Sequence, residues 1–168
     1  SITSNGKWAV ASIGQRDQGQ SRLINLLEKD HPEFLFEHPG NVTAHHFSGN
    51  GKWYISRTKD SNRLWNLATE DPSATFETIN EPQNSSQMQP FVFDRSRRWL
   101  VAGNRLIDLN NTAPLASSKL LPNDNFNPVG FSSDGNWLVA GNCLVDMRAQ
   151  ELGQDRFFAL PKIDSFNN

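Results

Sequence analysis

The sequence predicts an all-β fold made of four-stranded antiparallel sheets that repeat along the chain. Three observations lead to this prediction. One pattern occurs four times in 168 residues, each copy contains short apolar runs of strand length, and turn-forming dipeptides separate these runs. A period of about 40 to 45 residues is typical of repeat architectures that stack one supersecondary unit on the next, such as β-propellers.

Each copy opens with a turn followed by a Trp, which marks its register. The four Trp residues are separated by 45, 46 and 38 positions. The Asn-Gly and Asp-Gly dipeptides before three of them tolerate the positive φ angles that tight hairpins need, as do two Gly-Asn dipeptides further on. The four openings are ITSNGKWAVAS from Ile2 with Trp8, FSGNGKWYISR from Phe47 with Trp53, FDRSRRWLVAG from Phe93 with Trp99 and FSSDGNWLVAG from Phe131 with Trp137.

The elements of each copy follow in a fixed order. The first strand is expected just before the turn, and the second begins at the Trp. Apolar runs of four residues, such as 137–140, are too short for a helix. The third strands are expected at RLINL (22–26), RLWNL (63–67), RLIDL (105–109) and CLVDM (143–147). The fourth strands are expected within EFLFEH (33–38), ATFETI (74–79), PLASSKLL (114–121) and RFFALP (156–161).

Charge and composition exclude several classes of partner. The net charge is −2, whereas nucleic-acid-binding proteins usually carry an excess of positive charge that contacts the phosphates. Nucleic acid is therefore not expected as the main partner. No apolar stretch reaches the roughly 20 residues that cross a bilayer, and we expect no membrane partner. The lone Cys143 excludes an internal disulfide framework and suits a reducing compartment, hence a cytoplasmic protein. Because the chain starts at Ser1 within an expected element, we expect it to be a piece of something longer.

The repeated pattern F-S-x-D-G-x-W-L, then a Gly-rich turn, then R-L-W-D-L resembles the tryptophan-aspartate (WD) repeat family of β-propellers. The stretch RLWNLATEDPSATF at 63–76 is most similar to the repeat arrays of large bacterial signalling and defence proteins. The resemblance covers essentially the whole chain. It implies four blades, at about 1–40, 41–86, 87–125 and 126–168, that form one region over 1–168.

In that family a His, an Asp, a Ser and a Trp form a hydrogen-bonded tetrad. The resemblance implies a version of it in the second copy, from His38, Asp60, Ser56 and Trp65, although Asn66 replaces the family's Asp after the Trp. The third and fourth copies carry neither the His nor a second turn long enough for the Asp. Those blades are expected to be held by packing.

The two ends of the chain leave two arrangements open. Either the four blades are cut from a longer array, or the ends meet and close a small ring. We favour part of a larger propeller, or a half completed by blades from another part or copy of the chain, because an open arc of four blades leaves apolar faces wet. Homo-oligomers or further blades are therefore among the expected partners.

No metal, cofactor or catalytic constellation is expected. Neighbouring residues on a strand point to opposite faces, so His45 and His46 cannot chelate one ion. Asp108 and Asp146 occupy equivalent positions near strand ends, where the resemblance implies a structural role. The turn with Arg95, Arg97 and Arg98 is most simply a solvated hairpin tip, with an acidic or phosphorylated partner as the alternative.

The leading hypothesis is a non-enzymatic protein-interaction scaffold or sensor module of a larger, bacterial multidomain protein, which binds a protein partner or its own neighbouring domains. Two alternatives stay open: a propeller-type hydrolase or small-ligand binder using the central channel, and structural blades that complete an oligomeric or composite propeller. Turn and loop residues of several copies are the expected contacts with the partner: Arg57, Lys59, Asp60, Asn104, Asn125, Phe126 and Asn142.

Overall fold

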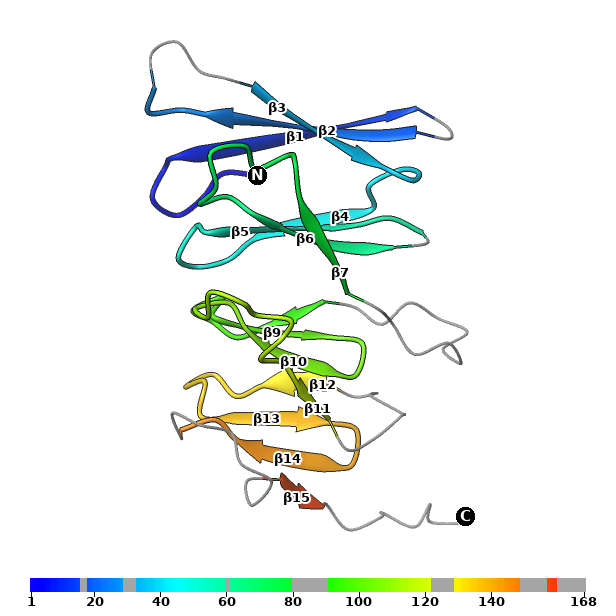
Figure 1. The fold of residues 1–168 in the computed structure, drawn as a ribbon. Coiled ribbons are helices and arrows are strands. Elements are labelled where there is room, and N and C mark those ends of the chain that lie inside the picture. Colours follow the sequence, from blue (N-terminus) through cyan, green and yellow to red (C-terminus); the bar gives the residue numbers. More distant parts are fainter. Residues whose placement is uncertain are drawn as a thin grey trace. The chain divides into compact units, whose positions relative to one another are not determined.

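The computed structural model describes residues 1–15, 18–28, 33–59, 61–79, 91–121, 129–148 and 157–159. These residues form fifteen β-strands and no helix (Figure 1). Accordingly, the described part of the chain contains no helix that is long and apolar enough to cross a membrane. The all-β prediction is confirmed for these residues.

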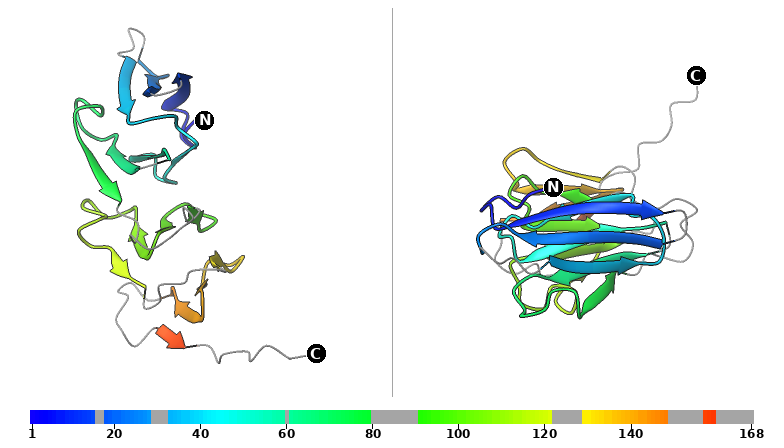
Figure 2. Two further views of the ribbon diagram at one scale, coloured as in Figure 1. Left: turned by 90° about the vertical axis from the view of Figure 1, so that its right-hand side faces the viewer. Right: turned by 90° about the horizontal axis from the view of Figure 1, so that it is seen from above.

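The strands pair in chain order into four antiparallel sheets. The first sheet consists of β1 (Trp8–Gln15), β2 (Gln18–Asn25) and β3 (Glu33–His38), the three blue strands seen from above in Figure 2. The second consists of β4 (Ala44–Phe47), β5 (Trp53–Arg57), β6 (Asn62–Asn66) and β7 (Phe76–Ile79). The third consists of β8 (Val92–Phe93), β9 (Trp99–Ala102), β10 (Arg105–Asp108) and β11 (Lys119–Leu120), and the fourth of β12 (Val129–Phe131), β13 (Trp137–Ala140), β14 (Cys143–Asp146) and β15 (Phe157–Ala159).

The prediction of four strands in every sheet is wrong for the first copy. Its first strand is reduced to an isolated bridge between Ile2 and Ala9. The backbone of Ser1 exchanges hydrogen bonds with Val10, and Thr3 N donates to Trp8 O.

The strand positions agree with the repeat, and each sheet lies within one of the expected blade ranges. The runs at 33–38 and 137–140 are strands β3 and β13 with the expected bounds. The glycines of the turn dipeptides adopt the left-handed conformation; for example, φ is 67° at Gly51 and 62° at Gly141. Whether 1–168 is one region stays a prediction, because the chain divides into two compact units.

Each Trp hairpin is closed by the same side-chain contact, which we call the turn clamp. A Thr, Ser or Asp five residues before the Trp accepts a hydrogen bond from the Trp backbone N–H. The four clamps join Trp8 N to Thr3 Oγ1 at 2.9 Å, Trp53 N to Ser48 Oγ at 3.0 Å, Trp99 N to Asp94 Oδ1 at 2.7 Å and Trp137 N to Ser132 Oγ at 2.9 Å. In each copy the backbone N–H of the clamp residue donates to the Trp carbonyl in return.

The strand that carries the second repeat motif also ends in the same way in all four copies. An Asn or Asp side chain accepts the N–H of the residue two positions later, which is an Asx turn and stops the strand. The four acceptors are Asn25, Asn66, Asp108 and Asp146, with N to Oδ1 distances of 2.9 to 3.1 Å. These contacts give Asp108 and Asp146 a structural role, as the family resemblance implied.

Unit 1 comprises Ser1–Asn80 and Asp108–Ala116, and thus contains the first two sheets. Its core lies between them. Trp8, Val10, Leu23 and Phe36 of the first sheet pack on Phe47, Tyr54, Trp65 and Leu67 of the second copy. The ring of Phe36 stacks on Tyr54 at 5.2 Å between centroids and lies 4.5 Å from that of Trp65. Two sheets thus bury the faces that neither could bury alone.

Unit 2 comprises Glu81–Ile107 and Ser117–Asn168, which include the fourth sheet and most of the third. Its core consists mainly of aliphatic side chains, and Val101 and Leu106 of the third sheet pack on Leu138 and Val145 of the fourth. Cys143 is buried in the same cluster. Packing of apolar side chains holds these two sheets together, as expected for copies that lack the His.

Arg97 is strained where the other copies carry glycine. It occupies the turn position of Gly6, Gly51 and Gly135, and has a φ of 56°. A left-handed conformation costs a non-glycine residue about 1–2 kcal/mol, partly offset by the greater unfolded-state entropy of Gly. We expect Arg97→Gly to raise the free energy of unfolding by about 0.5–1 kcal/mol in urea titrations. Arg95→Gly is the matched control in the same turn, and a gain there as large as that for Arg97→Gly would contradict this explanation.

Candidate functional site

A buried chain of hydrogen bonds runs through the aromatic core of unit 1. The indole Nε1 of Trp65 donates to Ser56 Oγ at 3.0 Å, and Ser56 Oγ lies 3.4 Å from Nδ1 of His38. On the other side of the imidazole, Nε2 lies 3.1 Å from Ser21 Oγ. Three of the four residues that the family resemblance implied are therefore connected, and the fourth, Asp60, lies outside the described residues.

The chain continues past the tetrad toward the surface. Ser21 Oγ accepts a hydrogen bond from the Tyr54 hydroxyl at 3.0 Å and lies 3.1 Å from Ser12 Oγ. Ser12 Oγ in turn is 3.1 Å from Nδ1 of His45. Because Ser12 and Ser21 come from the first sheet and Tyr54 and His45 from the second, polar contacts cross the same interface as the aromatic rings.

Burial keeps the two titratable groups at the centre of this hydrogen-bond chain, His38 and Tyr54, uncharged at neutral pH. Loss of water around His38, together with the nearby Arg63 guanidinium, lowers the pKa of its imidazole to about 4. Burial also raises the pKa of Tyr54 to about 12, against the opposing effect of its bonds to Ser21 and Ser12. A neutral imidazole has one donor and one acceptor nitrogen, which suits its position between two hydroxyls.

The Ser12 and His45 pair has the atom types of a nucleophile and a base, but the geometry favours a structural role. The Ser12 hydroxyl is shared between Ser21 and His45, so it forms one link of the chain. The ring of His45 also lies 6.3 Å from that of Tyr54. Loss of water and the charge of the N-terminal amine lower the pKa of His45.

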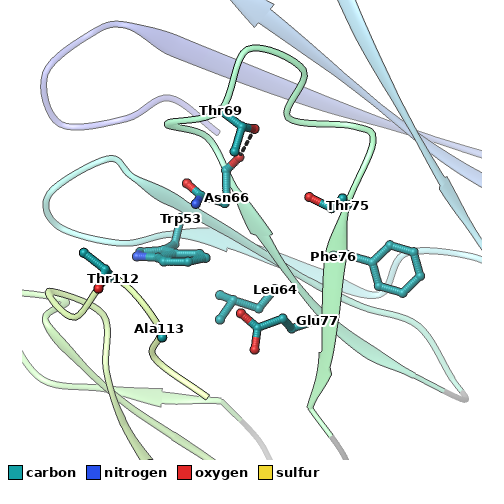
Figure 3. Close-up of a pocket in the computed structure, with 9 residues that line it drawn as sticks. All are labelled: Trp53, Leu64, Asn66, Thr69, Thr75, Phe76, Glu77, Thr112 and Ala113. Carbon is teal, nitrogen blue, oxygen red and sulfur yellow. Dashed lines mark hydrogen bonds between the residues drawn. The ribbon is translucent and has the colours of Figure 1, made fainter. Parts of the chain in front are cut away.

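A small open pocket lies on the other face of the second sheet, away from the aromatic core. Its volume is about 190 Å³. Trp53 and Leu64 form its apolar floor, and the Glu77 side chain lies beside them, whereas Phe76 points to the opposite side of β7 (Figure 3). The polar residues Asn66, Thr69, Thr75 and Thr112 and the small apolar Ala113 complete the lining.

The register of the strands explains this lining. In the β6 and β7 ladder Leu64 pairs with Glu77 and Trp65 pairs with Phe76, so alternate residues face opposite sides of the sheet. Glu77 is exposed, whereas Trp53 is buried and only 4% of its surface is exposed to solvent. The Thr69 hydroxyl donates to Asn66 O at 3.0 Å, which fixes the turn between β6 and β7 at the pocket mouth. The pocket therefore combines an aromatic surface, a carboxylate and hydroxyls.

The residues predicted to bind a partner are distributed over several turns. Lys59 and Asn142 are exposed, and Asn104 is half-buried with its carbonyl bonded to Leu121 N. Arg57 differs from the prediction, because it is buried and its Nε donates to Asn62 Oδ1 at 3.0 Å. Its guanidinium thus belongs to the β5 and β6 hairpin, since Arg57 and Asn62 face each other in that ladder.

The other expected contacts, Asp60, Asn125 and Phe126, lie outside the described residues. That the predicted contacts share one face stays a prediction. Arg95 and Arg97 are exposed in their turn, and the Arg98 guanidinium lies 5.0 Å from the centre of the Trp99 ring.

Burial raises the pKa of the Cys143 thiol. Within the described residues, no three His, Cys, Asp or Glu side chains are grouped so that they could hold a metal ion.

Sequence reasoning missed Ser21, Tyr54 and Glu77. Tyr54 stands in the apolar run 53–55, where a polar group that faces inward signals a buried hydrogen bond. Ser21 lies between Gln20 and Arg22 and gave no such signal. The turn clamp had a visible signal, because Thr, Ser or Asp recurs five residues before every Trp. Glu77 had none, since the pocket depends on how the 108–116 segment of unit 1 meets β7.

Comparisons with known proteins do not identify a family. No protein-family model matches the chain, and neither does any curated protein. Among solved structures, it is similar to a protein assigned as a 6-phosphogluconolactonase from Bacteroides uniformis, with 12% identity and a TM-score of 0.47. The match covers 95% of this chain and 54% of that protein, so the chain spans about half its length.

The depressed pKa of His38 predicts a pH-dependent stability. The unfolded imidazole binds a proton near pH 6.5 and the folded one only near pH 4. The contribution of neutral His38 to the free energy of unfolding, on the order of 3 kcal/mol, is therefore complete above about pH 6.5. It is lost as the pH falls toward 4. Urea titrations across this range should show that His38→Gln removes most of this slope. Equal slopes for the two proteins would contradict a neutral, buried His38.

Ser21 is predicted to contribute more than Ser12 to stability. Ser21→Ala removes the hydroxyl that accepts the Tyr54 bond and leaves one His38 nitrogen without its partner inside the core. An unsatisfied buried group costs about 1–3 kcal/mol. Ser12→Ala is the control, because Ser12 is exposed and water can replace its hydroxyl. Chemical denaturation of both variants tests the difference, and similar losses would show that Ser21 is not the centre of the chain.

Proposed function

We propose that this chain is a non-enzymatic protein-interaction module built of WD-repeat-type β-propeller blades. Its partner is another protein or a neighbouring domain of a larger parent protein. The observation that supports this function most directly is the pocket beside β7, because its size and chemistry suit one side chain of a protein segment.

The size of the pocket argues for a side chain over a metabolite. Its volume of about 190 Å³ is below the roughly 300–1,000 Å³ of typical small-molecule sites. It is also open at the edge of a sheet, since β7 is hydrogen-bonded to β6 alone among the described strands. An extended segment can pair with such an edge and send alternate side chains toward the sheet.

The lining argues for a basic side chain. Glu77 supplies a carboxylate, and Trp53 supplies an aromatic ring that can attract a cation. The threonine hydroxyls at the mouth can accept further hydrogen bonds from a guanidinium or ammonium group. We therefore assign the pocket to an Arg or Lys side chain of an extended partner segment.

A peptide titration tests this assignment. The probes are acetyl-Val-Arg-Val-amide and acetyl-Val-Glu-Val-amide, followed through the NMR signals of the Trp53 indole and the Glu77 amide. The Arg peptide is expected to bind more tightly, and Glu77→Gln is expected to weaken it about fivefold, the effect of about 1 kcal/mol at an exposed charge pair.

Glu70→Gln is the matched control, because Glu70 is exposed but does not line the pocket. It should leave the affinity for the Arg peptide unchanged. Equal affinities for the two peptides, or equal effects of the two Gln variants, would remove the basic side chain from the proposal.

A further inference from the structure

Three of the four clamped Trp rings have a cation of the chain itself over them. Such a cation is attracted by the electron-rich face of the indole. The three pairs, with the distance from the cation to the ring centre, are Lys7 and Trp8 at 4.9 Å, Arg98 and Trp99 at 5.0 Å, and Arg148 and Trp137 at 4.9 Å. Among the described residues no cation lies over the fourth ring, that of Trp53, which forms part of the pocket floor beside β7.

The fourth copy shows how a carboxylate holds such a cation in place. Arg148 Nε donates to Asp146 Oδ1 at 2.9 Å, and Arg148 Nη2 donates to Asp146 Oδ2 at 2.6 Å. The guanidinium therefore forms a bidentate pair with one carboxylate while it lies over Trp137. Trp137 and Asp146 face each other in the β13 and β14 ladder, and Arg148 follows two residues later.

The repeat register places the pocket of the second copy at the same position. Trp53 pairs with Asn66 in the β5 and β6 ladder, as the Trp and Asp of the fourth copy pair with each other. Two residues after Asn66, at the position of Arg148, the chain carries Ala68. The backbone N–H of each of these two residues donates to the side chain of the strand-end Asn or Asp, so the backbones correspond. The methyl group of Ala68 is too short to cover the Trp53 ring.

Glu77 supplies a carboxylate to the second copy. The strand-end residue there is Asn66, whose amide carries no charge to pair with a cation. Glu77 lines the same pocket as Asn66, and its side chain lies beside Trp53 (Figure 3). The pocket therefore offers an indole and a carboxylate, the two groups that hold Arg148 in the fourth copy.

We propose that the pocket selects Arg over Lys in the partner segment, and that the guanidinium of this Arg lies over Trp53 and pairs with Glu77. Arg148 provides the precedent, since it lies over Trp137 and pairs with Asp146. This inference rests on the function proposed above, which assigns to the pocket a basic side chain of either kind. A planar guanidinium can stack on an indole while its edge donates two hydrogen bonds to one carboxylate, whereas an ammonium is a compact, strongly hydrated charge without that fork.

NMR titrations of the wild-type chain with acetyl-Val-Arg-Val-amide and acetyl-Val-Lys-Val-amide test the selection. The Trp53 indole and the Glu77 amide report on binding. The Arg peptide is expected to bind about tenfold more tightly than the Lys peptide, because only Arg can make the bidentate pair. Equal affinities for these two peptides, both tighter than for acetyl-Val-Glu-Val-amide, would overturn the selection of Arg and leave the proposed function in place. If neither binds more tightly than the Glu peptide, the basic side chain and this inference both fail.

Ala68→Arg tests the position of the guanidinium, because it places an Arg of the chain where Arg148 stands in the fourth copy. Ala68 is exposed, so the longer side chain does not disturb the core. This variant is expected to weaken binding of the Arg peptide at least tenfold, since its own guanidinium competes for Trp53 and Glu77.

Leu27→Arg is the matched control for this variant. Leu27 follows Asn25 of the first copy by two positions, so it is the equivalent residue there, and its N–H likewise donates to the Asn side chain. It is 70% exposed and does not line the pocket, so Leu27→Arg adds the same charge without filling the site. It should leave the affinity for the Arg peptide unchanged. An unchanged affinity in Ala68→Arg, or an equal loss in Leu27→Arg, would overturn the inference.

Discussion

The turn clamp is the contact on which the rest of the structure depends. A side-chain oxygen five residues before each Trp accepts the Trp N–H, which closes the hairpin and starts the second strand at the Trp. Since residues alternate between faces from that point, the clamp also decides which side chains enter a core. A slip of one residue would send Tyr54 and Ser56 to the wrong side of the second sheet.

With the register set, the two units bury their sheet faces by different means. Unit 1 combines stacked rings with the polar chain through His38, whose hydrogen bonds require one arrangement of the two sheets. Unit 2 relies on aliphatic packing, which is less directional. The same repeat thus tolerates either solution, because the bonds from backbone N–H groups to side chains in the clamp and the Asx turn occur in all four copies.

The repeat explains why so much of the fold was predictable from the sequence. Four aligned copies located the strands, and the glycines located the turns, because positive φ angles leave few other choices. The incomplete first sheet was missed because a repeat pattern does not show how many residues a ladder needs. The burial of Arg57 was not expected from the sequence, because its partner Asn62 lies across a hairpin. The pocket at Glu77 depends on a distant segment, 108–116, for which no local pattern exists.

Amide hydrogen exchange at the four clamped Trp residues tests the central claim most directly, because their backbone N–H groups report on the clamps one by one. If one hairpin unit is built four times, the N–H groups of Trp8, Trp53, Trp99 and Trp137 should all exchange as slowly as those of the neighbouring strand residues. Exchange of any of these four N–H groups at the rate of an unfolded chain, while its strand stays protected, would contradict the clamp as the common element of the fold.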